Sequence, residues 1–167
     1  MERIEDVANE KGWDLAPALF LLQRWPENDV TAAHLPVSWK DDRRPYPQVL
    51  EVVASDIEEG TFRLPPVPAG ARAAGFAVLM EMWTLRDADA NAGPAGPIAD
   101  DPRRVETRMV TAVDVEGRAY MVVRARGEER SSRLLDGPPL VGGGVIYDAL
   151  RRMVRTLNSR DSDVPAQ

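Results

Sequence analysis

The chain has 167 residues, of which 29% are charged, 44% apolar and 6% aromatic, a composition typical of one globular domain. Near this length a chain hides about 68–70% of its unfolded surface, so a core can form without cross-links. Cysteine is absent, which excludes disulfides, thiolate metal sites and a cysteine nucleophile. The longest apolar runs, Ala16–Leu22 and Gly75–Met80, are much shorter than the ~20 residues of a membrane helix, and the charged start has no apolar signal region. We therefore expect a cytoplasmic protein without a membrane segment.

Charge is distributed unevenly along the chain. The formal net charge is −6, yet residues 1–102 carry 9 basic and 18 acidic side chains, whereas residues 103–160 carry 12 and 7. Such asymmetry is found in proteins that bind polyanions or self-associate. Arginines interleaved with acids are more often a solvated surface, and we adopt that interpretation here.

The N-terminal quarter predicts one helix, then a strand, and then a long connection. Residues Glu2–Lys11 place apolar side chains on one stripe, and Gly12 follows where a helix commonly ends. Residues Leu15–Trp25 are almost entirely apolar, which suits either a helix or a buried strand, and we predict a strand entered at Ala18. Residues Glu27–Pro45 are rich in Pro and Asp without a sustained period, which predicts a connection.

The middle of the chain predicts a second helix and a central strand. Apolar residues recur at helical spacing over residues 47–59, with Pro47 in the first turn and Gly60 after the last. Residues Ala73–Arg86 are apolar on both faces, as in the centre of a sheet. Residues Asp87–Asp101 contain little that could be buried and predict a flexible surface loop.

The C-terminal part predicts a hairpin and a third helix. Apolar and polar residues alternate on both sides of the turn Asp114–Gly117, where glycine suits a positive φ. After the polar stretch Arg126–Arg133, residues Val145–Leu157 place apolar side chains on one helical face. Residues 158–167 are polar and predict a disordered tail.

Together these elements predict a single α+β domain over residues 1–157. We expect a mainly antiparallel sheet of about four strands with two or three helices packed on one face. In particular, the helices at 47–59 and 145–157 are expected to cover the apolar side of three adjacent strands within residues 73–126.

Glu81 is the most unusual residue in the predicted central strand, because it interrupts an apolar run. A buried carboxylate must be paired, hydrogen-bonded or protonated. It could orient a ligand in a pocket, or it could form a cross-strand ion pair with Arg108 or Arg124, and we favour the ion pair. If a ligand binds, Glu81, Arg108 and Arg124 are the residues predicted to contact it.

Other candidate chemistry is weakly supported by the sequence. His34 is the only histidine, in an irregular segment, and predicts a surface loop residue rather than a metal or triad member. Gly142–Gly144 precedes a helix but lacks the Lys-Ser/Thr of a phosphate-binding loop, and predicts a hinge. We predict no catalytic residues, no metal and no cofactor.

Nucleic-acid binding would use arginines of the hairpin with Tyr120 as a stacking group. The sequence pI of about 4.9 and the lack of a recognisable motif make nucleic acid an unlikely partner. Among the tryptophans, we expect Trp83 in the core and Trp39 partly exposed and available to a partner protein. The residues predicted to contact such a partner are Trp39, Tyr120 and Arg126.

Three segments carry a resemblance to other proteins. They are Gly75–Trp83 with its Glu-x-Trp ending, Asp101–Arg108 leading into the hairpin, and the Asp-Ala-Leu-Arg-Arg helix segment at 148–152. Over residues 75–157, about half of the chain, the sequence is similar to short uncharacterised proteins of actinobacteria and their phages. The resemblance implies a single α+β domain of that origin, with no activity and no catalytic residues to carry over.

These observations favour a non-catalytic interaction or regulatory protein, phage- or prophage-encoded, that binds an unknown protein partner and self-associates. Two alternatives remain: a small-ligand-binding protein or hydrolase with a pocket around Glu81, and a weak nucleic-acid binder acting through the arginine-rich hairpin.

Overall fold

The computed structural model describes residues 1–39, 44–85, 98–135 and 144–162. Most of the predicted loop Asp87–Asp101 (residues 87–97), Gly142 and Gly143, and the last five residues of the predicted tail lie outside the described residues. The described end of that loop includes a short 3-10 turn at Ile98–Asp100. The elements, in chain order, are α1 (Glu2–Lys11), β1 (Ala18–Arg24), β2 (Val30–Leu35), α2 (Tyr46–Glu59), β3 (Arg72–Leu85), the 3-10 turn η1 (Ile98–Asp100), β4 (Arg104–Asp114), β5 (Ala119–Ala125), β6 (Ser131–Leu135) and α3 (Gly144–Ser162).

The strands form one antiparallel sheet in the order β2-β1-β3-β4-β5-β6. The α+β class is confirmed, but the sheet has six strands rather than about four. The two strands absent from the prediction, β2 and β6, are the edge strands, and both are short. β2 lies inside the predicted connection Glu27–Pro45, and β6 carries mostly polar residues. Edge strands have only one hydrogen-bonded neighbour and little buried surface, so their sequence pattern is weak.

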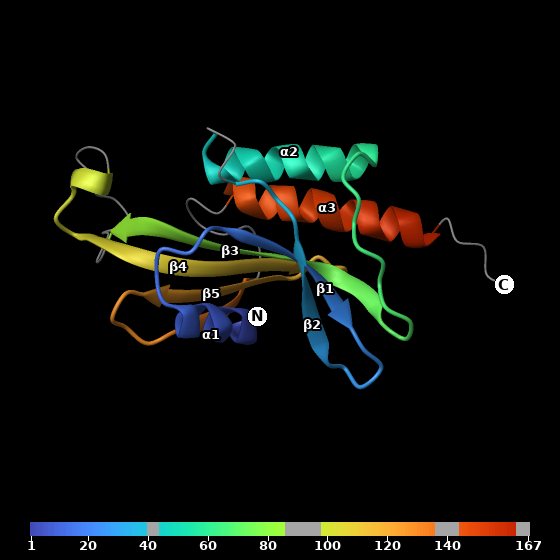
Figure 1. Cartoon of the computed structure of the whole chain (residues 1–167), viewed down its shortest axis with the longest axis horizontal. Coiled ribbons are helices and arrows are strands. Elements are labelled where there is room, and N and C mark those ends of the chain that lie inside the picture. Colours follow the sequence, from blue (N-terminus) through green and yellow to red (C-terminus); the bar gives the residue numbers. More distant parts are fainter. Residues whose placement is uncertain (40–43, 86–97, 136–143, 163–167) are drawn as a thin grey trace.

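Two helices cover one face of the sheet and the third lies against the other (Figure 1). The side chains of α2 and α3 pack on those of β1 and β3 that face the same side, such as Leu50, Leu150 and Phe76. This confirms that the helices at 46–59 and 144–162 cover the apolar side of residues 73–126. On the opposite face, α1 packs Ile4 and Ala8 against the central strands.

β3 is apolar on both faces because helices lie on both sides of it. Phe76, Val78 and Met80 point toward α2 and α3, whereas Ala77 and Leu79 point toward the α1 side. The ambiguous segment before it is indeed the strand β1, which pairs with β3 and supplies Leu19 and Leu21 to the same core; the helical alternative is excluded.

Two tryptophans and the chain end differ from expectation. Trp39 is buried, 6% exposed, with its ring edge-to-face on Tyr46, whereas Trp83 is 45% exposed beneath the guanidinium of Arg104. Both expectations of burial were therefore wrong. Trp83 follows Glu81 at a two-residue spacing near the end of β3, so it lies on the α1 face, where Arg104 stacks on its ring, whereas Trp39 belongs to the core cluster that includes α2. Helix α3 continues to Ser162, five residues beyond the predicted end at 157.

The β4–β5 turn is organised by a single carboxylate. Asp114 accepts hydrogen bonds from the backbone N–H groups of Glu116 (3.0 Å) and Arg118 (2.9 Å). It also accepts bonds from Arg118 Nε (2.8 Å) and from the hydroxyl of Tyr120 (3.2 Å). Gly117 has a φ of 82°, the left-handed conformation predicted for this turn. Asp114 thus serves as the acceptor that holds both ends of the turn.

This arrangement predicts a contribution to stability that depends on pH. Burial raises the pKa of Asp114, but the bonds from Arg118 and Tyr120 outweigh it and leave that pKa below its ordinary value of 3.8. The folded state therefore favours the carboxylate, so its contribution is present above about pH 4 and is lost as the pH falls through the folded pKa. Urea unfolding between pH 2 and 6 should show a flatter decline for Asp114→Asn than for the native chain. Equal slopes would contradict this account.

Candidate functional site

A row of charged side chains crosses three strands on the α1 face of the sheet. Glu81 in β3 is the register partner of Arg108 in β4, which in turn is the register partner of Arg124 in β5. Arg108 donates to Glu81 Oε1 from Nε (2.9 Å) and Nη2 (2.7 Å). The structure therefore brings together all three residues of the predicted ligand site and confirms the cross-strand pair between Glu81 and Arg108.

Helix α1 contributes a fourth charge that the sequence did not reveal. The fully buried Glu5 receives two hydrogen bonds from Arg124, from Nε at 2.7 Å and from Nη2 at 2.8 Å, and lies 3.6 Å from Arg108 Nη1. Trp13 covers the guanidinium of Arg108, whose carbon lies 4.6 Å from the indole centroid. We call Glu5, Glu81, Arg108 and Arg124 the buried charge cluster.

The buried charge cluster has little capacity left for a ligand. The Glu81 side chain is only 7% exposed, and its second carboxylate oxygen accepts the backbone N–H of Leu15 at 2.9 Å. Arg108 also donates to the carbonyl of Gly12, so both ends of the α1–β1 connection are bound to the cluster. Both oxygens of this carboxylate already accept hydrogen bonds, one from a guanidinium and the other from a backbone N–H, so it has little capacity to bind a ligand. The cluster instead holds α1 and the following loop against the sheet.

Ion pairs at the start of α1 extend this attachment. Arg130 lies between Asp6 (2.5 Å) and Glu2 (3.5 Å), and the hydroxyl of Ser132 donates to Glu2 at 2.7 Å. The acids of the N-terminal part therefore face arginines of the C-terminal part. Much of the charge asymmetry of the chain is satisfied inside the molecule, by pairs that are distant in sequence.

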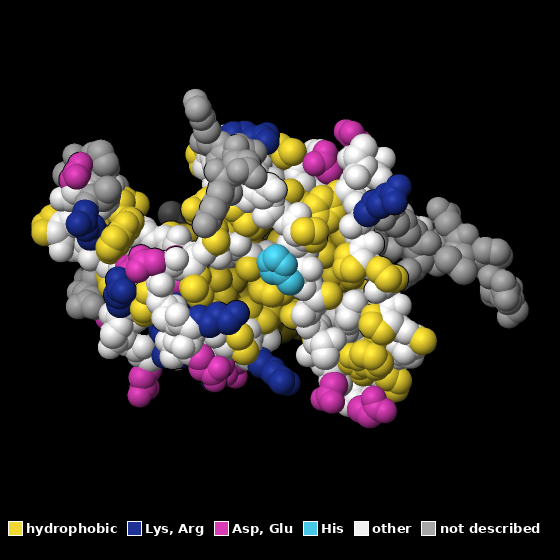
Figure 2. Space-filling model, viewed as in Figure 1, with side chains coloured by type: hydrophobic (Ala, Val, Ile, Leu, Met, Phe, Trp, Pro, Cys, Tyr) yellow, Lys and Arg dark blue, Asp and Glu magenta, His cyan; other side chains and the backbone are white. Residues whose placement is uncertain are grey.

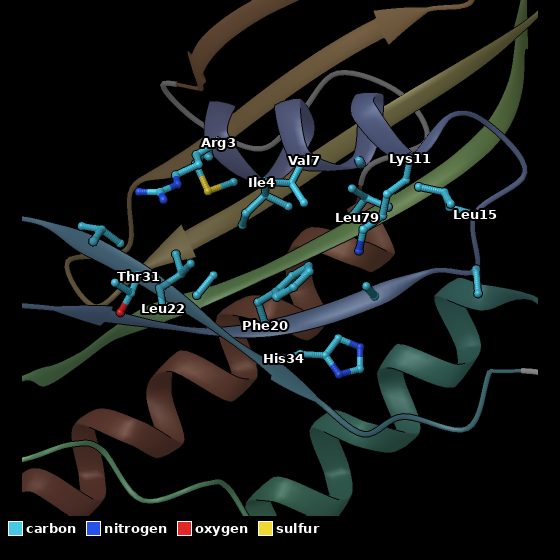
Figure 3. Close-up of a pocket in the computed structure, with 16 residues that line it drawn as sticks. Arg3, Ile4, Val7, Lys11, Leu15, Phe20, Leu22, Thr31, His34 and Leu79 are labelled. Atoms are coloured by element: carbon cyan, nitrogen blue, oxygen red, sulfur yellow. The ribbon is translucent and has the colours of Figure 1, made fainter.

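The other side of α1 lines an open cleft of about 520 Å³ between that helix and strands β1 and β2 (Figure 3). Phe20 and Leu22 of β1 form its floor, with the T-shaped ring pair of Phe20 and His34 at 5.7 Å. Ile4 and Val7 of α1 form one wall. Figure 2 shows hydrophobic side chains gathered around the histidine in the middle of this face. We call this the α1–β2 cleft.

Cationic side chains lie around the α1–β2 cleft. Arg3 and Lys11 extend from α1, eight residues apart, which corresponds to about 12 Å along a helix. Neither has an ion-pair or hydrogen-bond partner within the part of the chain that the structure describes. His34 is exposed, as expected, but it stands in β2 rather than in an irregular segment. Among the described residues, the cleft thus combines an apolar surface with two cations that form no ion pair.

The residues predicted to contact a partner are dispersed. Trp39 is buried on the α2 side, and Tyr120 is half-buried and bonded to Asp114. Arg126 is exposed at the end of β5, where it pairs with Glu106 and stacks 5.4 Å from the ring of Trp13. The three do not share a surface, and the α1–β2 cleft contains none of them.

Comparison of the sequence with known protein families assigns the chain to one of them. Residues 1–155 match the model of the PPA1309-like protein family. This chain belongs to the PPA1309-like family. The family takes its name from a protein of a Propionibacterium, an actinobacterium, in line with the actinobacterial resemblance, while a phage origin stays a prediction. No similar curated protein and no similar solved structure was found.

The family match covers every residue that lines the α1–β2 cleft and every member of the buried charge cluster in this PPA1309-like protein. Its described residues contain no group of three or more His, Asp and Glu side chains that could hold a metal ion. Within the same residues, none of the helices has the length and apolar character that crossing a bilayer requires. The family name itself specifies no activity.

Proposed function

We propose that this PPA1309-like protein is a non-catalytic interaction protein whose α1–β2 cleft binds an apolar, acidic segment of a partner protein. The observation that carries the proposal is an exposed apolar cleft flanked by Arg3 and Lys11, two cations without a partner among the described residues. Exposed apolar patches with polar rims mark interaction sites. Carboxylates on the partner would meet the two cations, while its apolar side chains would contact the floor.

The exposure of individual apolar side chains supports this assignment. Val7 on α1 and Val30 on β2 are among the most exposed large apolar residues of the described chain, and they stand on opposite sides of the cleft. Burying such side chains is favourable by about 25 cal/mol per Å² of apolar surface. A partner that filled the cleft would therefore gain hydrophobic stabilisation from both walls.

The two alternatives have less support. A ligand at Glu81 would have to displace Arg108 and the Leu15 N–H from its carboxylate. A polyanion would have to compete with the carboxylates that already pair with the hairpin arginines, among them Glu5 for Arg124 and Glu106 for Arg126. The α1–β2 cleft requires no rearrangement of this kind.

Site-specific cross-linking tests the proposal, because the chain has no cysteine and a single introduced thiol is unique. Val7→Cys and, as a matched control, Val145→Cys would each carry a thiol-linked benzophenone in a lysate of the native host. The two positions have nearly equal exposure, 44% and 43%, but Val145 lies on α3 on the other side of the sheet. We expect a discrete cross-linked protein with Val7→Cys and none with Val145→Cys.

Charge reversal then tests the chemistry of the partner. Arg3→Glu combined with Lys11→Glu should reduce the cross-linked product at least tenfold, whereas reversal of the exposed Arg155 on α3 should leave it unchanged. Identical cross-linking from both cysteines, or insensitivity to the cleft reversal, would contradict the proposal.

The cleft volume also lies within the usual range of small-ligand sites, about 300–1,000 Å³. Dodecanoate is a suitable probe for an amphipathic anion of low molecular weight. Saturable calorimetric binding of dodecanoate that is lost on Lys11→Glu, in the absence of any cross-linked protein, would assign the cleft to such a ligand in place of a protein segment.

A further inference from the structure

The sheet ends at β2 in a strand edge without the usual protection. In the described chain β2 pairs with β1 alone. Its six residues, Val30–Leu35, include no charged residue and no proline, and their pairing with β1 runs without a bulge. Natural proteins normally protect such an edge with lysine, proline or a bulge, because unpaired backbone groups are a template for another strand.

The hairpin that joins β1 to β2 determines which backbone groups of β2 are free. The N–H of Trp25 donates to the carbonyl of Asp29 at 2.8 Å, and the carbonyl of Trp25 accepts the N–H of Asn28, so Trp25 and Asp29 occupy a hydrogen-bonded position of the ladder. Because hydrogen-bonded and non-hydrogen-bonded pairs alternate along an antiparallel ladder, the pairs at Val30, Ala32 and His34 are non-hydrogen-bonded. The N–H and C=O groups of these three residues therefore point away from β1.

We propose that β2 is a self-association edge: a second copy of this chain pairs antiparallel with it, with Ala32 opposite Ala32 on a two-fold axis. In this register Val30 faces His34 of the second copy, and the free N–H and C=O groups of all three residues find partners. A register shifted by one residue would turn the second copy over, so that side chains from its opposite face would lie beside Val30, Ala32 and His34 of the first copy. A two-fold axis through one residue makes the contact isologous and closed.

The side chains and charges of β2 suit a second copy. Ala32 is small and exposed, so two backbones can approach at this point. The nearest acids, Glu27 and Asp29, lie in the hairpin turn. In an antiparallel pair the two turns stand at opposite ends, so two chains of net charge −6 meet along a neutral segment. This argument is independent of the proposed function of the cleft.

The second copy would also extend the α1–β2 cleft. Residues directly opposite each other in an antiparallel pair point to the same face of the sheet. Val30 of the second copy would therefore lie beside His34 on the face that α1 partly covers. The exposed Val30 would gain an apolar neighbourhood, and the two clefts would share a continuous floor across the dimer axis.

Sedimentation equilibrium of the full chain tests the proposal. We expect a monomer–dimer equilibrium whose Kd rises more than tenfold on Ala32→Pro, because proline removes an N–H that β1 does not use and leaves the β1–β2 ladder complete. Far-UV circular dichroism should be unchanged, as should the urea midpoint at concentrations where both chains are monomeric. A chain that stays monomeric at millimolar concentration, or a dimer unaffected by Ala32→Pro, would overturn the proposal.

Cysteine pairing tests the register. Hydrogen-bonded antiparallel pairs have Cα atoms about 5.5 Å apart, within the range that a disulfide bridges, so Ala32→Cys should form a covalent dimer on mild oxidation. Val30→Cys is the matched control on the same strand and face, where the two thiols would be about 13 Å apart along the strands. Faster cross-linking of Val30→Cys than of Ala32→Cys would exclude the two-fold axis at Ala32.

Discussion

Replacing Arg108 with alanine is expected to lower the free energy of unfolding by about 3–5 kcal/mol. The Arg108 side chain is completely buried and holds the carboxylate of Glu81, with Glu5 3.6 Å away. Removing the guanidinium would leave buried negative charge without compensation and would also release the Gly12 carbonyl. Urea unfolding followed by tryptophan fluorescence measures the loss.

Two controls separate burial of the charge from loss of an ion pair in general. Arg103→Ala removes a bidentate pair with Asp101 on the protein surface, and it should leave the urea midpoint nearly unchanged. Adding Glu81→Gln to Arg108→Ala should recover part of the stability, because it removes the carboxylate that loses its guanidinium partner, whereas Glu5 keeps its two hydrogen bonds from Arg124. If Arg103→Ala were as destabilising as Arg108→Ala, the role given to the buried charge cluster would be wrong.

Replacing Gly75 with alanine is the second substitution for which we expect a large loss of stability. Gly75 has a φ of 145°, which side chains rarely adopt, and an added Cβ would lie 2.2 Å from the carbonyl oxygen of Val113 and 2.8 Å from the Cα of Asp114. The backbone conformation alone costs roughly 1–3 kcal/mol for a residue other than glycine. The clash adds to this because both contacting atoms belong to the paired strand β4, which cannot move without breaking the ladder.

Gly70→Ala isolates the conformational part of this effect. Gly70 also has a positive φ, 87°, but an added Cβ would have no neighbour within 4 Å. We therefore expect a clearly smaller fall in the urea midpoint for Gly70→Ala than for Gly75→Ala. Similar losses for the two variants would show that close packing against β4 contributes little.

The sequence predicted most of the interior of this fold. The bounds of α1, the strand character of β1 and β3, the β4–β5 hairpin and the two helices of the core were all recognised. These elements have strong periodicity and clear turn residues. The sequence did not reveal β2 and β6, whose residues are stabilised mainly by a neighbouring strand. The burial of Trp39 and Trp83 was also predicted wrongly, because it depends on how far the helices extend over the sheet.

The candidate site likewise contains some residues that the sequence predicted and others that it did not. Glu81 was recognised because a charge inside an apolar strand is conspicuous, and Arg108 and Arg124 followed from the hairpin pattern. Glu5 was missed because an acid in the first turns of an exposed helix is ordinary in sequence. The α1–β2 cleft was missed because its lining comes from α1 and three strands whose order was unknown.

The sequence therefore predicted the properties that depend on residues only a few positions apart. These are the apolar stripes of the helices, the alternation in the strands, the glycine of the β4–β5 turn, and the need of Glu81 for a partner. The placement of α1 on the opposite face, the pairing of its acids with arginines more than 100 residues later, and the free edge at β2 followed only from the assembled sheet. The physical reason is that these features arise from contacts across strands. Local propensity carries no information about which strands become neighbours.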